Sequence, residues 1–245
     1  MEKFISVSSS SKKVLQIAQM SSSLPVDVII LGQTGVGRKL LANEVLPNEQ
    51  VFEAKELEKL ILDNKVNLKE FTTIIIHNIN KVLNKNEFLD NLQGIKIVAT
   101  GFNENQDYIN RFAVKIEILP LDERKEDLEK LTNIYIEEAN KIYSTSKVPK
   151  NIKIDLSGNG VTLKQSIYKS ILLQTMNKQD IMDTLYNFFI TEFKAERSYK
   201  ALLEIFEIPL LKASKTTYKS QLKMSEKLKI NRITLRKKFT KYFGE

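Results

Sequence analysis

The stretch that decides the fold runs from Asp27 to Leu40 and reads DVIILGQTGVGRKL. Asp27–Leu31 has the composition of a buried strand, and the glycines after it lead into a helical pattern. Glycines in this context let backbone amides converge on a phosphate, and the N-terminus of the next helix adds a partial positive charge. The residues predicted to hold such an anion are Gly32, Gly35, Gly37, Arg38 and Lys39.

The loop departs from the usual nucleotide-binding pattern, G-x-x-x-x-G-K-[ST], at its end. The glycine spacing is the same, but Arg38 occupies the lysine position, and Lys39 stands where a hydroxyl often helps to bind magnesium. Arginine keeps the charge, although its planar fork is bulkier than an ammonium group. A glycine-rich turn without a ligand therefore stays open as the alternative interpretation of these residues.

Further short apolar segments predict the rest of a sheet. They are Val51–Glu53, Thr73–Ile76, Ile95–Thr100 and Val114–Leu119. Strands that alternate with helical segments predict an α/β fold with a parallel sheet covered on both faces. From Asp122 onward the pattern is helical almost throughout.

Composition excludes several classes of site. The 245 residues include no cysteine and one histidine, which excludes disulfides, cysteine nucleophiles and thiolate zinc sites and leaves no all-protein metal cluster. Neither a membrane span nor the apolar core of a signal peptide is present, so we expect a cytoplasmic protein with no membrane partner.

Positive charge is concentrated at the C-terminal end of the chain. The formal net charge is +8, and residues 194–245 alone hold 14 Lys+Arg against 5 Asp+Glu. The remainder of the chain is therefore close to neutral. This asymmetry predicts an appended module that binds nucleic acid.

The basic segment itself predicts a helix-turn-helix. Residues 221–243 read QLKMSEKLKINRITLRKKFTKYF, in which Asn231 is a good N-cap for a second, basic helix. In a helix-turn-helix the second helix enters the major groove of double-stranded DNA. We expect base-edge contacts from Arg232, Thr234 and Arg236, and phosphate contacts from Lys237, Lys238 and Lys241. A solvated, lysine-rich helix end is the alternative.

Three motifs occur in an order that resembles the NtrC-like family, the AAA+ activators of sigma-54 RNA polymerase. They are GQTGVGRKL, PLDERKEDL at Pro120–Leu128, and the sequence SGN at Ser157–Asn159. LKINRITLRKKF is similar to the Fis-type DNA-binding domain of the same family. The resemblance implies an AAA+-like α/β subdomain at 1–119, a helical lid at 120–188 and an all-α Fis-type helix-turn-helix domain at 189–245.

The residues that carry ATP hydrolysis in that family are replaced in this sequence. In TIIIHNIN, His77 and Asn78 stand at the positions of the Walker B Asp-Glu pair, which holds magnesium and activates water. Gly101 occupies the sensor asparagine position, and Val161 occupies that of the lid arginine. We therefore expect a pseudo-ATPase with no catalytic residue and no metal site, in which ATP or ADP could bind without hydrolysis.

The resemblance also bears on partners. The interval from Lys39 to Ile76 contains no GAFTGA loop, so we do not expect conventional sigma-54 activation. Arg111 aligns with one of the family's arginine fingers, whereas Asn105 replaces the other. The alternatives are an adaptor that joins another AAA+ regulator or RNA polymerase, and a hydrolysing sigma-54 activator with unusual site residues.

A homodimer through the Fis-type domain, reading a pseudo-palindromic site, is the oligomeric state that the sequence predicts. The helix before the basic segment carries more apolar residues than a three-helix unit should need. These residues are Leu202, Leu203, Phe206, Ile208, Leu210 and Leu211.

Overall fold

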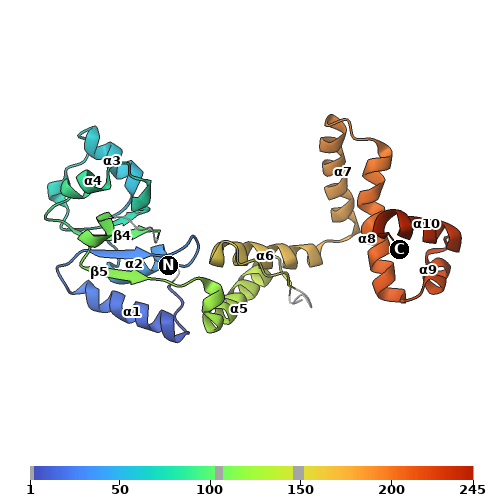
Figure 1. The fold of residues 1–245 in the computed structure, drawn as a ribbon, viewed down its shortest axis with the longest axis horizontal. Helices are drawn as coiled ribbons and strands as arrows, with labels where there is room; N and C mark the ends of the chain where they lie inside the picture. The colour runs from blue at the N-terminus through green and yellow to red at the C-terminus, as the bar shows by residue number, and fades with distance from the viewer. Residues whose placement is uncertain (1–2, 103–106, 146–151, 245) are drawn as a thin grey trace. The chain divides into compact units, whose positions relative to one another are not determined.

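The computed structural model of the chain describes residues 3–102, 107–145 and 152–244. The chain divides into two compact units, Met1–Thr175 and Met176–Glu245, and each is described here by itself (Figure 1). None of the helices in the described ranges is long and apolar enough to cross a membrane.

A five-stranded sheet forms the centre of the first unit. Its strands are β1 (Val28–Leu31), β2 (Val51–Glu53), β3 (Thr73–His77), β4 (Lys96–Gly101) and β5 (Val114–Glu117). They pair in the order β2-β3-β4-β1-β5, and every pair is parallel. The predicted α/β fold with a parallel sheet is confirmed. The loop after β1 leaves the carboxyl edge of the sheet, which is where ligands bind in open α/β folds.

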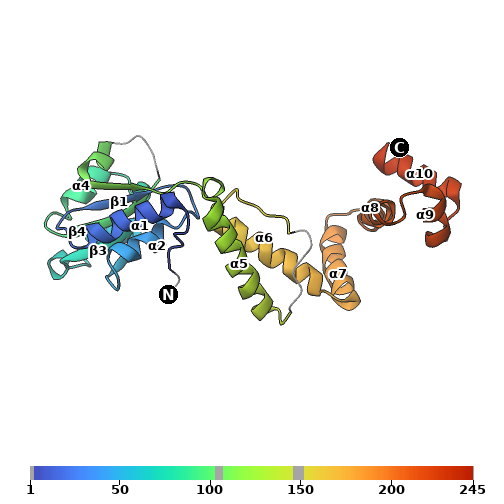
Figure 2. The ribbon, with the colours of Figure 1, turned by 90° about the horizontal axis from the view of Figure 1, so that it is seen from below.

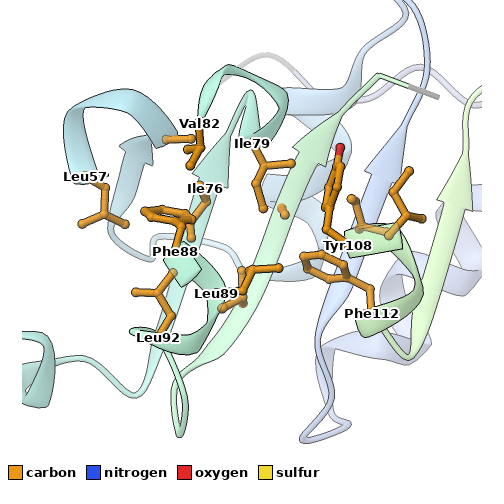
Figure 3. Packing of buried hydrophobic residues seen from close by; sticks show 14 of the residues in the cluster. Leu57, Ile76, Ile79, Val82, Phe88, Leu89, Leu92, Tyr108 and Phe112 are labelled. Atoms are coloured by element: carbon orange, nitrogen blue, oxygen red, sulfur yellow. The ribbon is translucent and has the colours of Figure 1, made fainter. Parts of the chain in front are cut away.

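Both faces of the sheet are covered, which explains the run of isoleucines in β3. Ile74 and Ile76 face a cluster that includes α3 (Ala54–Leu62) and α4 (Lys85–Asp90), as Figure 3 shows for Ile76. Ile75 faces the other side, against α1 (Ser9–Ser22) and α2 (Arg38–Val45). Successive side chains of a strand point to opposite faces, so a strand covered on both sides is apolar at every position.

Two longer helices complete the first unit. They are α5 (Lys125–Ile142) and α6 (Asn159–Thr175), which pack against each other through a cluster that includes Ala139, Leu163 and Ile167 (Figure 2). The start of α6 contacts the phosphate loop directly, because the Gly160 amide donates a hydrogen bond to the Gly35 carbonyl at 3.1 Å. The pair therefore covers the loop in the position of a lid.

The second unit is entirely helical in its described part. It comprises α7 (Lys178–Lys194), α8 (Tyr199–Tyr218), α9 (Gln221–Leu228) and α10 (Arg232–Phe243). Leu211 of α8, Met224 of α9 and Leu235 of α10 form its core together with Phe239. The division between the units falls before α7, whereas the predicted boundary at 188–189 lies inside that helix.

Candidate functional site

The phosphate loop adopts a backbone conformation that requires glycine at two positions. Gly35 and Gly37 have φ values of 78° and 107°, in the left-handed region that side chains disfavour. A Cβ atom added to Gly35 would also lie 2.1 Å from the Gly158 carbonyl oxygen. The loop is therefore built for close approach of the lid backbone.

Arg38 turns its guanidinium group toward the end of β4. It is buried, donates a hydrogen bond from Nη1 to the Gly101 carbonyl, and lies 4.5 Å from the ring centroid of Phe102. Burial lowers the pKa of Arg38 below its ordinary value. A Cβ atom at Gly101 would lie 3.3 Å from Ile79, so a sensor asparagine would be crowded there. Arg38 thus fastens α2 to β4 at Gly101, the residue for which the sequence resemblance predicted a sensor position.

Lys39 forms a polar cluster with two neighbouring strand ends. Its Nζ lies 2.5 Å from Oε1 of Glu53, and Asn78 Nδ2 donates to Oε2 of Glu53 at 2.8 Å. Burial would raise the pKa of Glu53, but the hydrogen bonds from Lys39 and Asn78 outweigh it and lower the pKa. Glu53 was not among the site residues predicted from the sequence. Its position at the carboxyl end of a parallel strand is the sequence feature from which it could have been predicted.

The residues at the expected magnesium position do not fit a magnesium ion. His77 is buried, and burial, with a contribution from the charge of Lys39, lowers its pKa to about 4. Its Nδ1 atom has no hydrogen-bond partner among the described residues. Magnesium binds oxygen ligands, whereas this position offers a neutral imidazole, the ammonium group of Lys39, and the carboxylate of Glu53. Both carboxylate oxygens of Glu53 are already engaged, one by Lys39 and the other by the amide group of Asn78.

A cavity of about 700 Å³ lies between the loop and the start of α6. Four cationic side chains line it, and none of its described lining residues is acidic; the four are Arg38, Lys39, Lys81 and Lys164. Lys164 stands one helical turn beyond Val161, lies 2.9 Å from Glu138, and is 5.1 Å from the ring centroid of Tyr135. The sequence analysis missed Lys81 and Lys164, because only the tertiary structure brings their segments to the loop.

A smaller and mainly apolar cavity of about 250 Å³ adjoins the same loop. Phe4 and Ile5 from the N-terminal segment line it together with Leu131 and Tyr135 of α5. Ligand sites in proteins are commonly apolar with a few convergent polar groups. The two cavities together suit a ligand that has an apolar ring and a chain of anionic groups. The ring would lie in the smaller cavity and the anionic groups in the cation-lined one.

The segment PLDERKEDL has a structural role in this chain. Arg124 lies 3.2 Å from Asp127 and donates from Nη2 to the Val36 carbonyl at 3.0 Å. Asp127 accepts hydrogen bonds from the backbone amides of Val7 and Ser8 at 2.6 and 2.8 Å and from the Ser11 hydroxyl. The pair therefore ties the beginning of α5 to the N-terminal segment, to α1 and to the phosphate loop.

Arg111, the predicted arginine finger, is paired within its own chain. It lies 2.7 Å from Asp90 and donates to the Asn86 carbonyl at 2.8 Å. It lines a pocket with Asp27 and Ile95, which precede β1 and β4, so it lies at the amino edge of the sheet, away from the phosphate loop. Asn105 lies outside the described residues.

The predicted DNA-binding residues gather on α10. Asn231 caps the helix by accepting from the Ile233 amide at 2.8 Å, as predicted. Arg232, Thr234, Arg236 and Lys237 are all exposed. Within the part of the chain that is described, the two arginines and Lys237 have no hydrogen-bond or ion-pair partner. Their charges are therefore available to an external anion.

Lys238 and Lys241 differ from their neighbours, because both are paired with α8. Lys238 forms an ion pair with Glu207, and Lys241 lies 3.0 Å from Glu204 and 2.9 Å from the Tyr242 hydroxyl. Tyr242 in turn donates to Glu207 at 2.6 Å. The hydrogen bonds from Lys238 and then Tyr242 lower the pKa of Glu207.

The fold and the loop define the class of the first unit: it has the AAA+ fold. NtrX from Brucella abortus in complex with ATP resembles the chain with a TM-score of 0.60 at 13% identity, covering 98% of this chain and 69% of that one. NtrX from the same organism in complex with ADP gives a TM-score of 0.59 at 15% identity, with the same coverage. At this identity the likeness shows the fold alone. The sequence matches no protein-family profile and no curated protein.

Proposed function

We propose that the chain is a DNA-binding transcription regulator that reads double-stranded DNA with α10 and does not hydrolyse ATP. The observation that carries this proposal is the exposed, unpartnered Arg232, Arg236 and Lys237 on a short helix behind a tight turn. The turn between α9 and α10 contains Lys229 with a φ of 53°, which gives a sharp change of direction.

The helical geometry places these side chains together. At about 100° per residue, Arg232, Arg236 and Lys237 fall within roughly 140° of arc around α10, with Lys237 opposite the buried positions and the two arginines beside them. Leu235 and Phe239 form the buried face of α10 and pack on α8 and α9. A helix that buries one side and presents cations on the other matches the recognition helix of a helix-turn-helix.

The side chains of α10 divide by chemistry into two roles. Arginine binds guanine in a bidentate manner, and threonine contacts either base edges or the thymine methyl group, so Arg232, Thr234 and Arg236 are assigned to base edges. Lys237 is assigned to phosphate, and Asn231 orients the helix N-terminus, where backbone amides favour an anion.

Several replacements support the absence of hydrolysis. Phosphoryl transfer from ATP depends on a metal ion that neutralises developing charge and on a group that orients the attacking water. His77 is buried and neutral, and the Asn78 amide is engaged by Glu53. Neither can supply a carboxylate, and an amide is no general base.

The test is DNA binding by the full chain. Fragments selected from the genome by the chain should share a pseudo-palindromic site, and binding should weaken steeply with salt. Arg232→Ala and Arg236→Ala together should lower affinity for that site by about 30-fold or more and relax its sequence preference, since each bidentate contact contributes on the order of 1–3 kcal/mol. Arg197→Ala, an exposed arginine outside α10, is the matched control. Unchanged affinity and preference in the double variant would contradict the assignment.

The cation-lined cavity favours a second function for the first unit, the binding of ATP or ADP without hydrolysis. The lysines at 39, 81 and 164 would supply positive charge where the family uses a metal ion. Binding should therefore be the same with magnesium and with a chelator, and Lys164→Ala should weaken it, whereas Lys55→Ala on the exposed face of α3 should not. Magnesium-dependent phosphate release abolished by Gly37→Ala would instead show a working ATPase.

A further inference from the structure

Lys238 and Lys241 belong to the same basic helix as the other cations of α10, but they differ in being paired with carboxylates of α8. They lie three residues apart on α10, and their partners Glu207 and Glu204 lie three residues apart on α8. Residues three apart occupy one face of a helix, so the two helices meet through two adjacent ion pairs. Tyr242 joins these pairs, since it accepts from Lys241 and donates to Glu207.

Burial separates the Lys238–Glu207 pair from ordinary surface ion pairs, which contribute little. The Lys241–Glu204 pair is of that ordinary kind, because its side chains are 43% and 42% exposed. The Glu207 side chain is 15% exposed, and both of its carboxylate oxygens accept hydrogen bonds, one from Lys238 and one from Tyr242. Moving Lys238 to a DNA phosphate would leave a largely buried carboxylate without its cation. Removing one partner of such a pair is costly, because the other charge stays desolvated.

We infer that Glu207 acts as a positioning residue that holds Lys238 on α8 and away from DNA phosphates, and so fixes the orientation of α10. The inference rests on the proposed DNA-binding function. It replaces the expectation that Lys238 contacts phosphate. Phosphate contacts from α10 then come from Lys237 and from the backbone amides at the helix N-terminus.

Salt dependence distinguishes a lysine that contacts phosphate from one that does not. Each phosphate neutralised on double-stranded DNA steepens the slope of log K against log salt by about 0.9. The experiment measures this slope for the full chain with and without Lys238→Gln, first in the wild-type background and then in the Glu207→Gln background. The same cycle with Lys241→Gln and Glu204→Gln serves as a comparison, because that pair is exposed.

In the wild-type background, Lys238→Gln should leave the slope unchanged, because the lysine is bound to Glu207. Glu207→Gln should steepen the slope by about 0.9 for each chain bound, and adding Lys238→Gln should remove that gain. The control is Glu226→Gln, which removes one negative charge from exposed α9 without releasing a lysine. Glu226→Gln should change the overall affinity for DNA. In this background, adding Lys238→Gln should still leave the salt slope unchanged.

The outcomes separate the inference from the function on which it rests. A wild-type chain that shows no DNA binding would overturn both. Wild-type binding together with a slope loss of about 0.9 for Lys238→Gln alone would overturn only the inference, since the lysine would then already contact phosphate. The Lys238→Gln variant leaves the core residues Leu235 and Phe239 of α10 unchanged. Its thermal unfolding curve checks that the fold is retained.

Discussion

His77 is a buried side chain at the carboxyl edge of the sheet, and its pKa reports on that environment. It lies at the end of β3 with 6% of its surface exposed, and burial, with the nearby charge of Lys39, lowers its pKa from 6.5 to about 4. The charged form is therefore disfavoured in the folded chain. Because the unfolded chain takes up the proton more readily, folding stability contributed by this residue is complete above pH 6.5 and is lost on acidification toward pH 4.

We expect the free energy of unfolding to depend less on pH in the His77→Gln variant than in the wild type between pH 6.5 and about pH 4. The wild-type free energy of unfolding should fall by up to about 3 kcal/mol more than that of the variant between the two pH values. Because the sequence contains one histidine, no other side chain has its ordinary pKa in the middle of this window. Denaturant unfolding at pH 7 and pH 4.5 measures the difference, and parallel pH curves for both chains would contradict the buried, neutral imidazole.

At the scale of elements, the junction between α5 and the rest of the first unit depends on one buried ion pair. Arg124 and Asp127 are both buried and together contact the N-terminal segment, α1 and the phosphate loop. Burial would raise the pKa of Asp127, but hydrogen bonds from Ser11, Ser8 and Val7 outweigh it and lower the pKa. Its contribution to stability is present above pH 3.8 and is lost as the pH falls through the lower folded-state pKa.

Asp127→Asn should destabilise the first unit strongly. It leaves the Arg124 charge buried without its counterion, a change that costs about 3–5 kcal/mol in comparable pairs. Asp63→Asn is the matched control, because Asp63 pairs with Lys65 on the surface at 2.9 Å and should cost less than about 1 kcal/mol. Calorimetry of the full chain measures both, and equal shifts in Tm would show that the junction does not depend on this pair.

At the scale of the whole molecule, apolar surface on the second unit points to self-association. Leu202 and Leu211 of α8 are buried in their own unit, whereas Phe206 and Leu210 are exposed. The helix α7 has no buried residue and exposes large apolar side chains: Ile181, Met182, Tyr186, Phe188, Ile190 and Phe193. A concentration of exposed large apolar side chains is expected at an interaction site, and we propose a second copy of the chain as the partner, which would give the two-fold symmetry of a pseudo-palindrome.

Phe206→Glu together with Leu210→Glu should convert a dimer into a monomer at micromolar concentration. Placing charge in the centre of an apolar interface should raise the dimer Kd by on the order of 30-fold or more. The matched control changes exposed apolar residues of the first unit, with Leu62→Glu and Met20→Glu. Sedimentation of the full chains gives the mass, and a monomeric wild-type chain would contradict the predicted homodimer.

The strands, the glycine loop and the basic helix were predictable because each depends on local pattern. A buried parallel strand must be apolar at every position, and a tight phosphate loop must carry glycine, so DVIILGQTGVG specifies both without reference to distant residues. The Asn231 cap follows the same rule, since its hydrogen bond reaches only two residues along the chain.

The tertiary structure decided what the charged residues contact. Arg38 resembles a phosphate ligand in sequence but reaches a carbonyl 63 residues away, and Lys238 resembles a DNA contact but reaches Glu207, 31 residues away. Lys81 and Lys164 join the phosphate loop only because strand ends and the lid meet at one edge of the sheet. A cation binds whichever acceptor the fold brings near it, and sequence spacing records that proximity only within a single helix, strand or turn.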